Sequence, residues 1–211
     1  MIDKQLCDEL HEQLLQGVRG ASSAGRFKEH QNWIGPYPNA PIEEAIFVPC
    51  APEDTRNLIG ILERYVNLES SEPRLVQCAL VHYQFETIHP FGDGNGRVGR
   101  LLIVLQLIQL GLLSAPLIYP SVYFERNRDE YYELLQSVRE GGAWNEWIEF
   151  FVRGIKEQCH ETLRFTQRIL ELREELLQEI GNVCHDPSPP VAYPSGFPYP
   201  ERRVQSAEWR R

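Results

Sequence analysis

The stretch HPFGDGNGRVGR, residues 89–100, gathers a histidine, an aspartate, an asparagine, four glycines and two arginines within twelve positions. An apolar run, residues 101–105, follows directly and indicates a buried helix. The stretch therefore has the pattern of a loop that leads into a helix N-terminus. Such a loop offers free backbone N–H groups and the positive end of the helix dipole to an anion. We expect an anion site here, with a base beside it.

The polar residues of this loop suit nucleotide phosphate chemistry. His89 is a candidate general base, because imidazole titrates near neutral pH and is partly neutral at pH 7. Asp93 is a candidate Mg²⁺ ligand, because magnesium prefers hard oxygen donors. Gly94, Asn95 and Gly96 predict a turn whose N–H groups can approach a phosphate closely. Each residue alone could also have a purely structural role, such as that of a histidine at a helix end or an aspartate in a turn.

The two arginines of the stretch, Arg97 and Arg100, are three positions apart and so share one helical face. Both fall in the first turns of the expected helix, where positive charge is unfavourable unless an anion is present. A pair of surface salt bridges is the alternative explanation.

Most of the remaining chain has the periodicity of amphipathic helices. Helices are expected over residues 3–18, 54–66, 73–88, 98–112, 128–139 and 143–181. The helix before the motif must end near His89, because Pro90 disfavours helical geometry in the residue before it. Five prolines in residues 36–52 leave room only for a small edge strand or hairpin. The predicted fold class is all-α with one small β element.

Composition limits the classes of function. A chain of 211 residues is one domain with appendages, and its net charge of −9 argues against a nucleic-acid partner. Five cysteines without a C-x-x-C pair, and a polar N-terminus, favour a reduced, cytoplasmic protein. The longest apolar run, residues 101–113, is too short to span a membrane. Six prolines in residues 183–200 predict that residues 182–211 form a disordered tail.

The motif HPFGDGNGRVGR fills every specified position of H-P-F-x-D-G-N-G-R-x-x-R and so resembles the signature of the Fic domain. The resemblance extends upstream to residues 31–35 and 47–49, and downstream to residues 123–132. In all it covers about residues 15–155. It implies a Fic-type helical bundle over residues 1–181, with a β-hairpin flap at about residues 34–49.

Fic proteins typically transfer AMP from ATP to a hydroxyl group of a target protein. The resemblance implies that His89 deprotonates a Ser, Thr or Tyr of the target. Asp93 would hold Mg²⁺ against the α- and β-phosphates of ATP. The amides of Gly94 and Gly96, together with Asn95, would form an anion hole.

The remaining roles also follow from the resemblance. Arg97 and Arg100 would engage the β- and γ-phosphates, and Phe91 would anchor the loop in the core. Tyr132 is a candidate neighbour of the adenine, with a core tyrosine as the equally weighted alternative. The flap would dock the protein substrate by strand addition.

One regulatory element of the family is missing. Many Fic proteins carry an inhibitory helix with the pattern S/T-x-x-x-E-G/N, whose glutamate pairs with the second arginine of the motif. Here Ser121 and Glu125 fit only the first five positions, and Arg126 follows them. We therefore expect no autoinhibition from within this chain. A partner chain supplies the glutamate, or the chain is shortened at its N-terminus, or it is constitutively competent.

Other functions remain open from the sequence. The chain has two E-x-x-H motifs, at residues 86–89 and 157–160, which is the pattern that a di-iron helical-bundle oxidase requires. Pro90, however, breaks the first helix directly after its histidine. A third possibility is a non-catalytic interaction module with the Fic fold. A damaged motif would favour this possibility, whereas the motif here is intact. Transfer of another phosphate-containing group, or removal of AMP from a modified target, are the related enzymatic alternatives.

Overall fold

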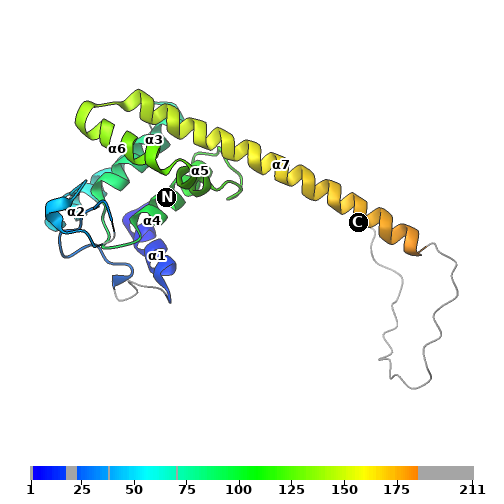
Figure 1. The fold of residues 1–211 in the computed structure, drawn as a ribbon, viewed down its shortest axis with the longest axis horizontal. Coiled ribbons are helices and arrows are strands. Elements are labelled where there is room, and N and C mark those ends of the chain that lie inside the picture. Colours follow the sequence, from blue (N-terminus) through cyan, green and yellow to red (C-terminus); the bar gives the residue numbers. More distant parts are fainter. Residues whose placement is uncertain (1, 18–22, 38, 70, 185–211) are drawn as a thin grey trace, which may run out of the picture. The chain divides into compact units, whose positions relative to one another are not determined.

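The computed structural model describes residues 2–17, 23–37, 39–69 and 71–184. In these ranges the chain forms seven α-helices and one 3₁₀ helix (Figure 1). They are α1 (Lys4–Leu15), η2 (Ile42–Glu44), α2 (Pro52–Asn67), α3 (Arg74–Ile88), α4 (Asn95–Gln109), α5 (Pro120–Arg126), α6 (Arg128–Gly141) and α7 (Trp144–Cys184). The predicted all-α class is confirmed. Two compact units divide the chain, Met1–Thr166 and Gln167–Arg211, and the motif lies in the first.

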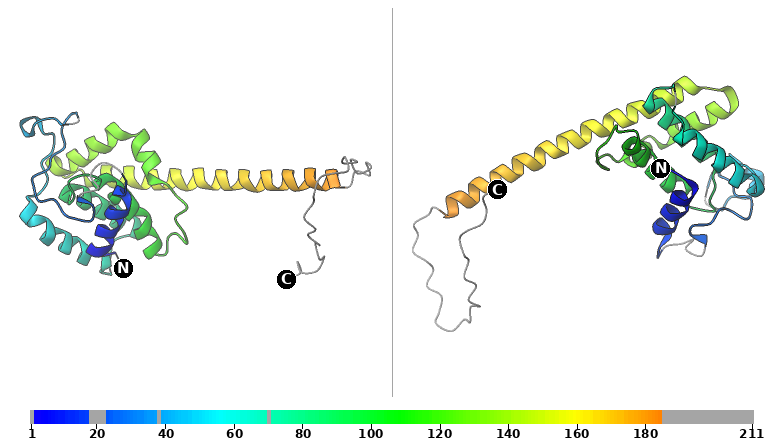
Figure 2. Two further views of the ribbon diagram at one scale, coloured as in Figure 1. Left: turned by 90° about the horizontal axis from the view of Figure 1, so that it is seen from below. Right: turned by 180° about the vertical axis from the view of Figure 1, so that it is seen from behind.

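Helices α3 and α4 form the centre of the first unit. They pack against each other, while α2 lies against α3 and α1 against α4 (Figures 1 and 2). Both central helices are buried on more than one face, which explains why their apolar residues show little helical asymmetry. Buried helices of this kind hold the connection between them, residues 89–94, in a fixed place.

An aromatic cluster joins α6 and the start of α7 to this centre. The ring of His82 on α3 stacks near Phe124 and Trp147, and the Trp147 indole donates a hydrogen bond to the Ala79 carbonyl oxygen at 3.0 Å. The two ring nitrogens of His82 lie 3.2 Å from the Gly99 carbonyl oxygen and 3.0 Å from the Tyr131 hydroxyl. Burial lowers the pKa of His82 to about 3, so this histidine is a neutral bridge between α3, α4 and α6.

The helix boundaries at the motif follow its prolines and glycines. Helix α3 ends at Ile88, and His89 adopts the left-handed conformation with φ 51°, as its position before Pro90 requires it to leave the helix. Helix α4 begins at Asn95, and Gly94 caps it with φ 82°, a conformation that glycine adopts without strain. The predicted loop between two buried helices is confirmed.

The predicted β-hairpin flap is not observed. Residues 34 and 47 form a single isolated antiparallel bridge, in which Ile34 N–H donates to the Phe47 carbonyl oxygen at 2.9 Å. Ile46 N–H donates back to the Ile34 carbonyl oxygen at 2.8 Å, and η2 lies between the two sides. Prolines between residues 36 and 49 remove ladder donors, so the pairing does not extend. The flap segment, residues 34–49, is therefore a loop whose two sides are joined by one β-bridge.

Helix α7 is one continuous helix where the sequence allowed one or two. Its part in the second unit carries exposed apolar side chains, including Ile169, Leu172 and Leu176. The tail was predicted to begin at residue 182, but α7 extends to Cys184, and the rest of the predicted tail lies outside the described residues. Among the helices described, none combines the length and apolar character needed to cross a membrane.

Candidate active site

The loop between α3 and α4 is braced from within by Asn95 and Phe91. The Asn95 side chain is 2% exposed, accepts a hydrogen bond from Phe91 N–H at 2.8 Å and donates one to the Phe91 carbonyl oxygen at 2.7 Å. The Phe91 ring is fully buried. The Asn95 side chain is thus engaged inside the loop, and its backbone N–H, at the first turn of α4, is the group placed for an anion.

Helix α1 braces the loop from outside through His11, a residue that the sequence analysis did not single out. The His11 ring stacks on Phe91 with centroids 3.8 Å apart. Its Nδ1 accepts from Gly25 N–H at 3.0 Å, so Nε2 carries the proton and donates to the Asp93 carbonyl oxygen at 2.9 Å. Burial lowers the pKa of His11, which favours this neutral form. No local pattern in α1 reveals a contact that spans 82 positions.

The loop segment before the flap adds a second brace, through Lys28 and Asn32. The Lys28 ammonium donates to the Ile88 carbonyl oxygen at 3.2 Å and to Asn32 Oδ1 at 2.9 Å. Asn32 Nδ2 in turn donates to the carbonyl oxygens of His89 at 3.1 Å and Phe91 at 2.8 Å. These bonds satisfy the carbonyls that the end of α3 leaves without helical partners. Only the resemblance had pointed to this region, and it gave no role to either residue.

His89 is the titratable group at the inner end of the loop. Its side chain is 18% exposed, and Nδ1 lies 3.3 Å from the Glu86 carbonyl oxygen. Burial lowers the pKa of His89 to about 4, and the charges of Lys28 and Arg139 act in the same direction. The imidazole is therefore neutral at pH 7 and able to accept a proton. Its φ of 51° is rare for a residue with a side chain, and such strain is typical of functional sites.

Asp93 and Arg97 lie at the outer end of the loop. The Asp93 side chain is 60% exposed, and its Oδ1 accepts from Gly94 N–H at 2.6 Å. Its other oxygen, Oδ2, is 3.7 Å from Arg97 Nη2. Both side chains reach solvent, so this ion pair is weak and can open to a ligand.

Arg100 lies one turn further along α4. Its Nε donates to the Ser121 hydroxyl at 3.2 Å, and within the described residues it forms no ion pair with a carboxylate. Gly96 faces this guanidinium, because a Cβ at residue 96 would lie 3.0 Å from Arg100 Nη1. The structure thus brings the two arginines and the N-terminus of α4 to one face.

Tyr132 lines a cavity of about 490 Å³ between α6 and the flap segment. Its side chain is 45% exposed, whereas the neighbouring Tyr131 is buried in the core. The alternative of a core tyrosine therefore applies to Tyr131 and leaves Tyr132 available to a ligand. Glu86 and Arg139, which the sequence analysis had not linked to nucleotide binding, line the same cavity.

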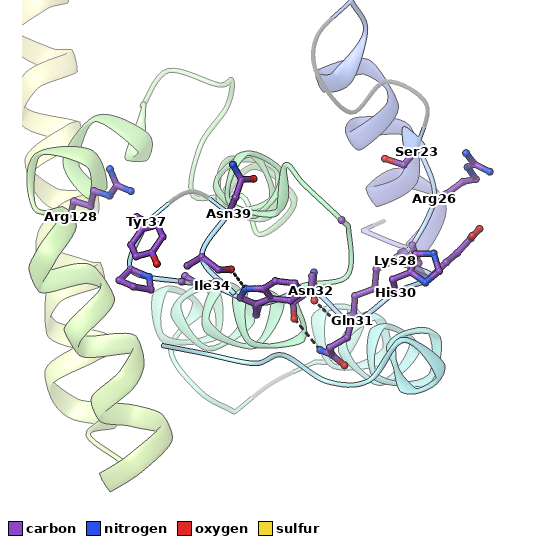
Figure 3. Close-up of a pocket in the computed structure, with 17 residues that line it drawn as sticks. Ser23, Arg26, Lys28, His30, Gln31, Asn32, Ile34, Tyr37, Asn39 and Arg128 are labelled. Carbon is purple, nitrogen blue, oxygen red and sulfur yellow. Dashed lines mark hydrogen bonds between the residues drawn. The ribbon is translucent and has the colours of Figure 1, made fainter. Parts of the chain in front are cut away.

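A larger cavity, of about 730 Å³, lies on the other side of the flap segment. It is lined mostly by residues 26–37, together with Gly92 and Arg128. Figure 3 shows Arg26, Lys28 and His30 gathered at one end of this cavity, and Tyr37 and Arg128 at the other. The flap segment contributes residues 34–36 to both cavities and so separates them.

The donor set of the loop fits a magnesium ion shared with phosphates better than a metal held by protein alone. Asp93 presents an exposed carboxylate beside backbone N–H groups, and Mg²⁺ is commonly held by one or two carboxylates plus phosphate oxygens. No group of three or more His, Cys, Asp or Glu that could hold a metal occurs in the part of the chain that the structure describes. The two E-x-x-H motifs therefore do not assemble a di-iron site there.

Comparisons with known proteins agree with this architecture. A family model, Fic/DOC family, matches residues 1–107. The chain is 34% identical over 157 residues to the protein adenylyltransferase Fic of Drosophila ananassae, which covers 74% of this chain and 27% of the relative. The chain thus spans about a quarter of the length of the curated relatives it matches.

Solved structures share the fold. A Fic family protein from Desulfovibrio desulfuricans G20 superposes with a TM-score of 0.63 at 24% identity, covering 78% of this chain and 49% of that one. The BepC effector of Bartonella tribocorum, solved with bound AMPPNP, superposes with a TM-score of 0.51 at 15% identity, covering 71% and 72%. With the family model matching half of the sequence, the chain belongs to the Fic/DOC family.

Proposed function

We propose that this protein transfers AMP from ATP to a Ser, Thr or Tyr hydroxyl of a target protein. The observation that carries the proposal is the neutral, partly buried His89 fixed beside a helix N-terminus that bears two arginines. Such a site pairs a proton acceptor with a place for polyphosphate. The relatives named adenylyltransferases support the reaction class.

His89 is the general base of the proposed reaction. Its Nδ1 faces the Glu86 carbonyl oxygen, which leaves Nε2 to take the proton of the target hydroxyl as that oxygen attacks the α-phosphate. The bond between the α- and β-phosphates breaks, and pyrophosphate leaves. A well-placed base typically contributes about 10²–10⁴-fold to such a step.

The outer end of the loop holds the phosphates. The N–H groups of Gly94, Asn95 and Gly96 surround the N-terminus of α4, where negative charge is stabilised. Arg97 and Arg100 neutralise the β- and γ-phosphates. Mg²⁺, when bound, spreads the charge of the α- and β-phosphates, and the Asp93 carboxylate would hold it. Phosphoryl-type transfer depends mostly on this positioning and neutralisation.

The cavity of about 490 Å³ is the proposed adenine pocket. Tyr132 offers an exposed aromatic face, and Ile34 and Phe47 of the flap also line the cavity, where the Arg139 guanidinium lies 3.5 Å from the centroid of the Phe47 ring. The bound AMPPNP of the BepC structure supports nucleotide binding by this fold.

The flap segment is the proposed docking edge for the protein substrate. Ile42, Ile46 and Val48 are between 41% and 57% exposed, which leaves apolar side chains for a partner. An extended target chain can add to the backbone beside the single bridge. The four described cysteines are free, which is consistent with the proposed cytoplasmic location.

Regulation by a glutamate from outside this chain completes the proposal. Ser121 is the only described hydrogen-bond partner of Arg100, so the γ-phosphate subsite is not blocked by a carboxylate in that part of the structure. A partner chain that carries S/T-x-x-x-E-G/N would inhibit by pairing with Arg100. A peptide of that pattern, added in excess, should lower activity, whereas the same peptide with Gln for Glu should not.

Intact mass spectrometry tests the proposed function without knowledge of the target. After incubation with ATP and Mg²⁺, the wild-type protein should gain the mass of one AMP unit on itself. His89→Ala should not. A gain of a single phosphate would instead favour kinase-type transfer.

A further inference from the structure

Glu86, in the last turn of α3, is a buried carboxyl group to which the function described above gives no role. Its residue is 6% exposed, and its Oε1 has no hydrogen-bond partner in the part of the chain that the structure describes. Its other oxygen, Oε2, lies 3.9 Å from Nδ1 of His89. A buried polar atom without a partner is costly, so its retention calls for a reason.

The fold makes room for this carboxyl group. A Cβ at Gly99 of α4 would lie less than 2.5 Å from Glu86 Oε1, so a side chain at that position is incompatible with the carboxyl where it stands. Glycine within a helix is destabilising by roughly 0.5–1 kcal/mol relative to alanine. The absence of a side chain at Gly99 therefore leaves the space that the Glu86 carboxyl group occupies.

The charges that act on Glu86 come from α4 and α6. Arg100 on α4 and Arg139 on α6 lower its pKa, but burial outweighs both and raises the pKa to about 7. The Tyr131 hydroxyl on α6 stays protonated, since burial raises its pKa well above the usual value. His89 itself is affected by Lys28 and Arg139, which lower its pKa, and by Asp93, which raises it.

We propose that Glu86 is a positioning residue for His89, whose carboxylate holds the Nδ1–H of the ring and stabilises the imidazolium that forms during transfer. The inference rests on the proposed role of His89 as the base. The proton of the target hydroxyl moves to Nε2 of His89, and the proton on Nδ1 stays there, 3.3 Å from the Glu86 carbonyl oxygen and 3.9 Å from the Glu86 carboxylate in the present geometry. No proton needs to reach Glu86. The carboxylate closes the present 3.9 Å separation when the ring becomes charged.

The pH dependence of the reaction follows from this pairing. Glu86 titrates near pH 7, so below that pH it is mostly neutral and cannot stabilise the imidazolium. Above that pH it is ionised, and His89 becomes the stronger base. We expect kcat to rise with pH through about 7, the pKa of Glu86, rather than through about 4, the pKa of His89.

The kinetic test uses Glu86→Gln, which keeps the shape of the side chain and removes its charge. We expect kcat to fall about 10-fold, as for a loss of one pKa unit in the base, with KM for ATP unchanged within about twofold. The rise of kcat near pH 7 should disappear. Thr87→Val is the matched control, because it removes an equally unpartnered hydroxyl one residue further along α3 without a change of charge.

Glu86→Asp keeps the charge and distinguishes this role from packing alone. It should retain a pH-dependent rise in kcat that Glu86→Gln lacks. If both variants lose activity equally and the rise near pH 7 is kept in Glu86→Gln, Glu86 is only a structural residue and the proposal is wrong.

Nuclear magnetic resonance tests the pairing without any turnover. The His89 ring protons, assigned by comparison with His89→Ala, should show an inflection near pH 7 in the wild type, from ionisation of Glu86. Glu86→Gln should lose that inflection and lower the pKa of His89, whereas Thr87→Val should keep both. An unchanged His89 titration in Glu86→Gln overturns the pairing. If the wild type shows the inflection but transfers no AMP, the proposed function fails and the pairing stands.

Discussion

The two ends of the loop between α3 and α4 differ in how much they are fixed before any ligand arrives. At the inner end the side chains of His89 and Glu86 are 18% and 8% exposed. At the outer end those of Asp93 and Arg97 are 60% and 39% exposed, and their mutual ion pair is long. The proposed base is therefore held in place by the fold, whereas the charges proposed to bind phosphate remain solvated. Changes at the inner end should alter the rate, and changes at the outer end should alter binding.

The largest expected effect comes from the inner end. His89→Ala should reduce AMP transfer by at least about 100-fold, because the hydroxyl loses its proton acceptor. Calorimetry should show ATP affinity close to that of the wild type, since the ring does not hold the phosphates. Labelling at a rate comparable to the wild type would remove His89 from the role of base.

Arg100→Ala should show the next largest effect, which is a loss of ATP affinity. Loss of a charge-assisted contact to phosphate costs about 1.5–3 kcal/mol, so ATP affinity should fall by roughly 10- to 150-fold. Calorimetry in the presence of Mg²⁺ measures this. A gain in activity instead would show that some glutamate restrains Arg100 in the wild type, and the account of an uninhibited chain would be wrong.

Asp93→Ala should weaken ATP binding about 10-fold, and only when Mg²⁺ is present. The reason is that its exposed carboxylate has no structural partner inside the core. The comparison is calorimetry with Mg²⁺ and with a chelator. Equal losses in both conditions would assign Asp93 to the turn, where its Oδ1 accepts from Gly94 N–H.

The smallest expected effect is on stability, and it concerns the outer end of the loop. Breaking the exposed Asp93–Arg97 pair with Arg97→Gln should change the free energy of unfolding by less than about 0.5 kcal/mol. Urea denaturation without nucleotide measures it. A loss of more than about 2 kcal/mol would mean that the outer end is as tightly built as the inner one.

The sequence predicts the local features of this site and misses those that depend on distant residues. Pro90 and Gly94 set the end of α3 and the cap of α4, and both effects act within a few residues. The braces by His11 and Lys28 join positions 82 and 60 residues apart, so no local pattern contains them. The flap was predicted as a hairpin from the resemblance to the Fic domain, but its prolines limit the pairing to one bridge.

The sequence also misses roles of single side chains that depend on how the loop and the helices pack. The family resemblance implied that Asn95 helps to form the anion hole, but its side chain bonds to the backbone of Phe91. Its role in binding an anion, like those of Gly94, Gly96 and Tyr132, stays a prediction. Glu86 appeared in the sequence only as part of a metal motif, since its contact with Gly99 forms when two helices pack.

Parallel reactions with ATP labelled at the α- or the γ-phosphate test the central claim most directly. With Mg²⁺ and the wild-type protein, the α-label should enter protein and the γ-label should not. His89→Ala should incorporate neither. Incorporation of the γ-label, or of the α-label by His89→Ala, would contradict transfer of AMP by a base held at the end of α3.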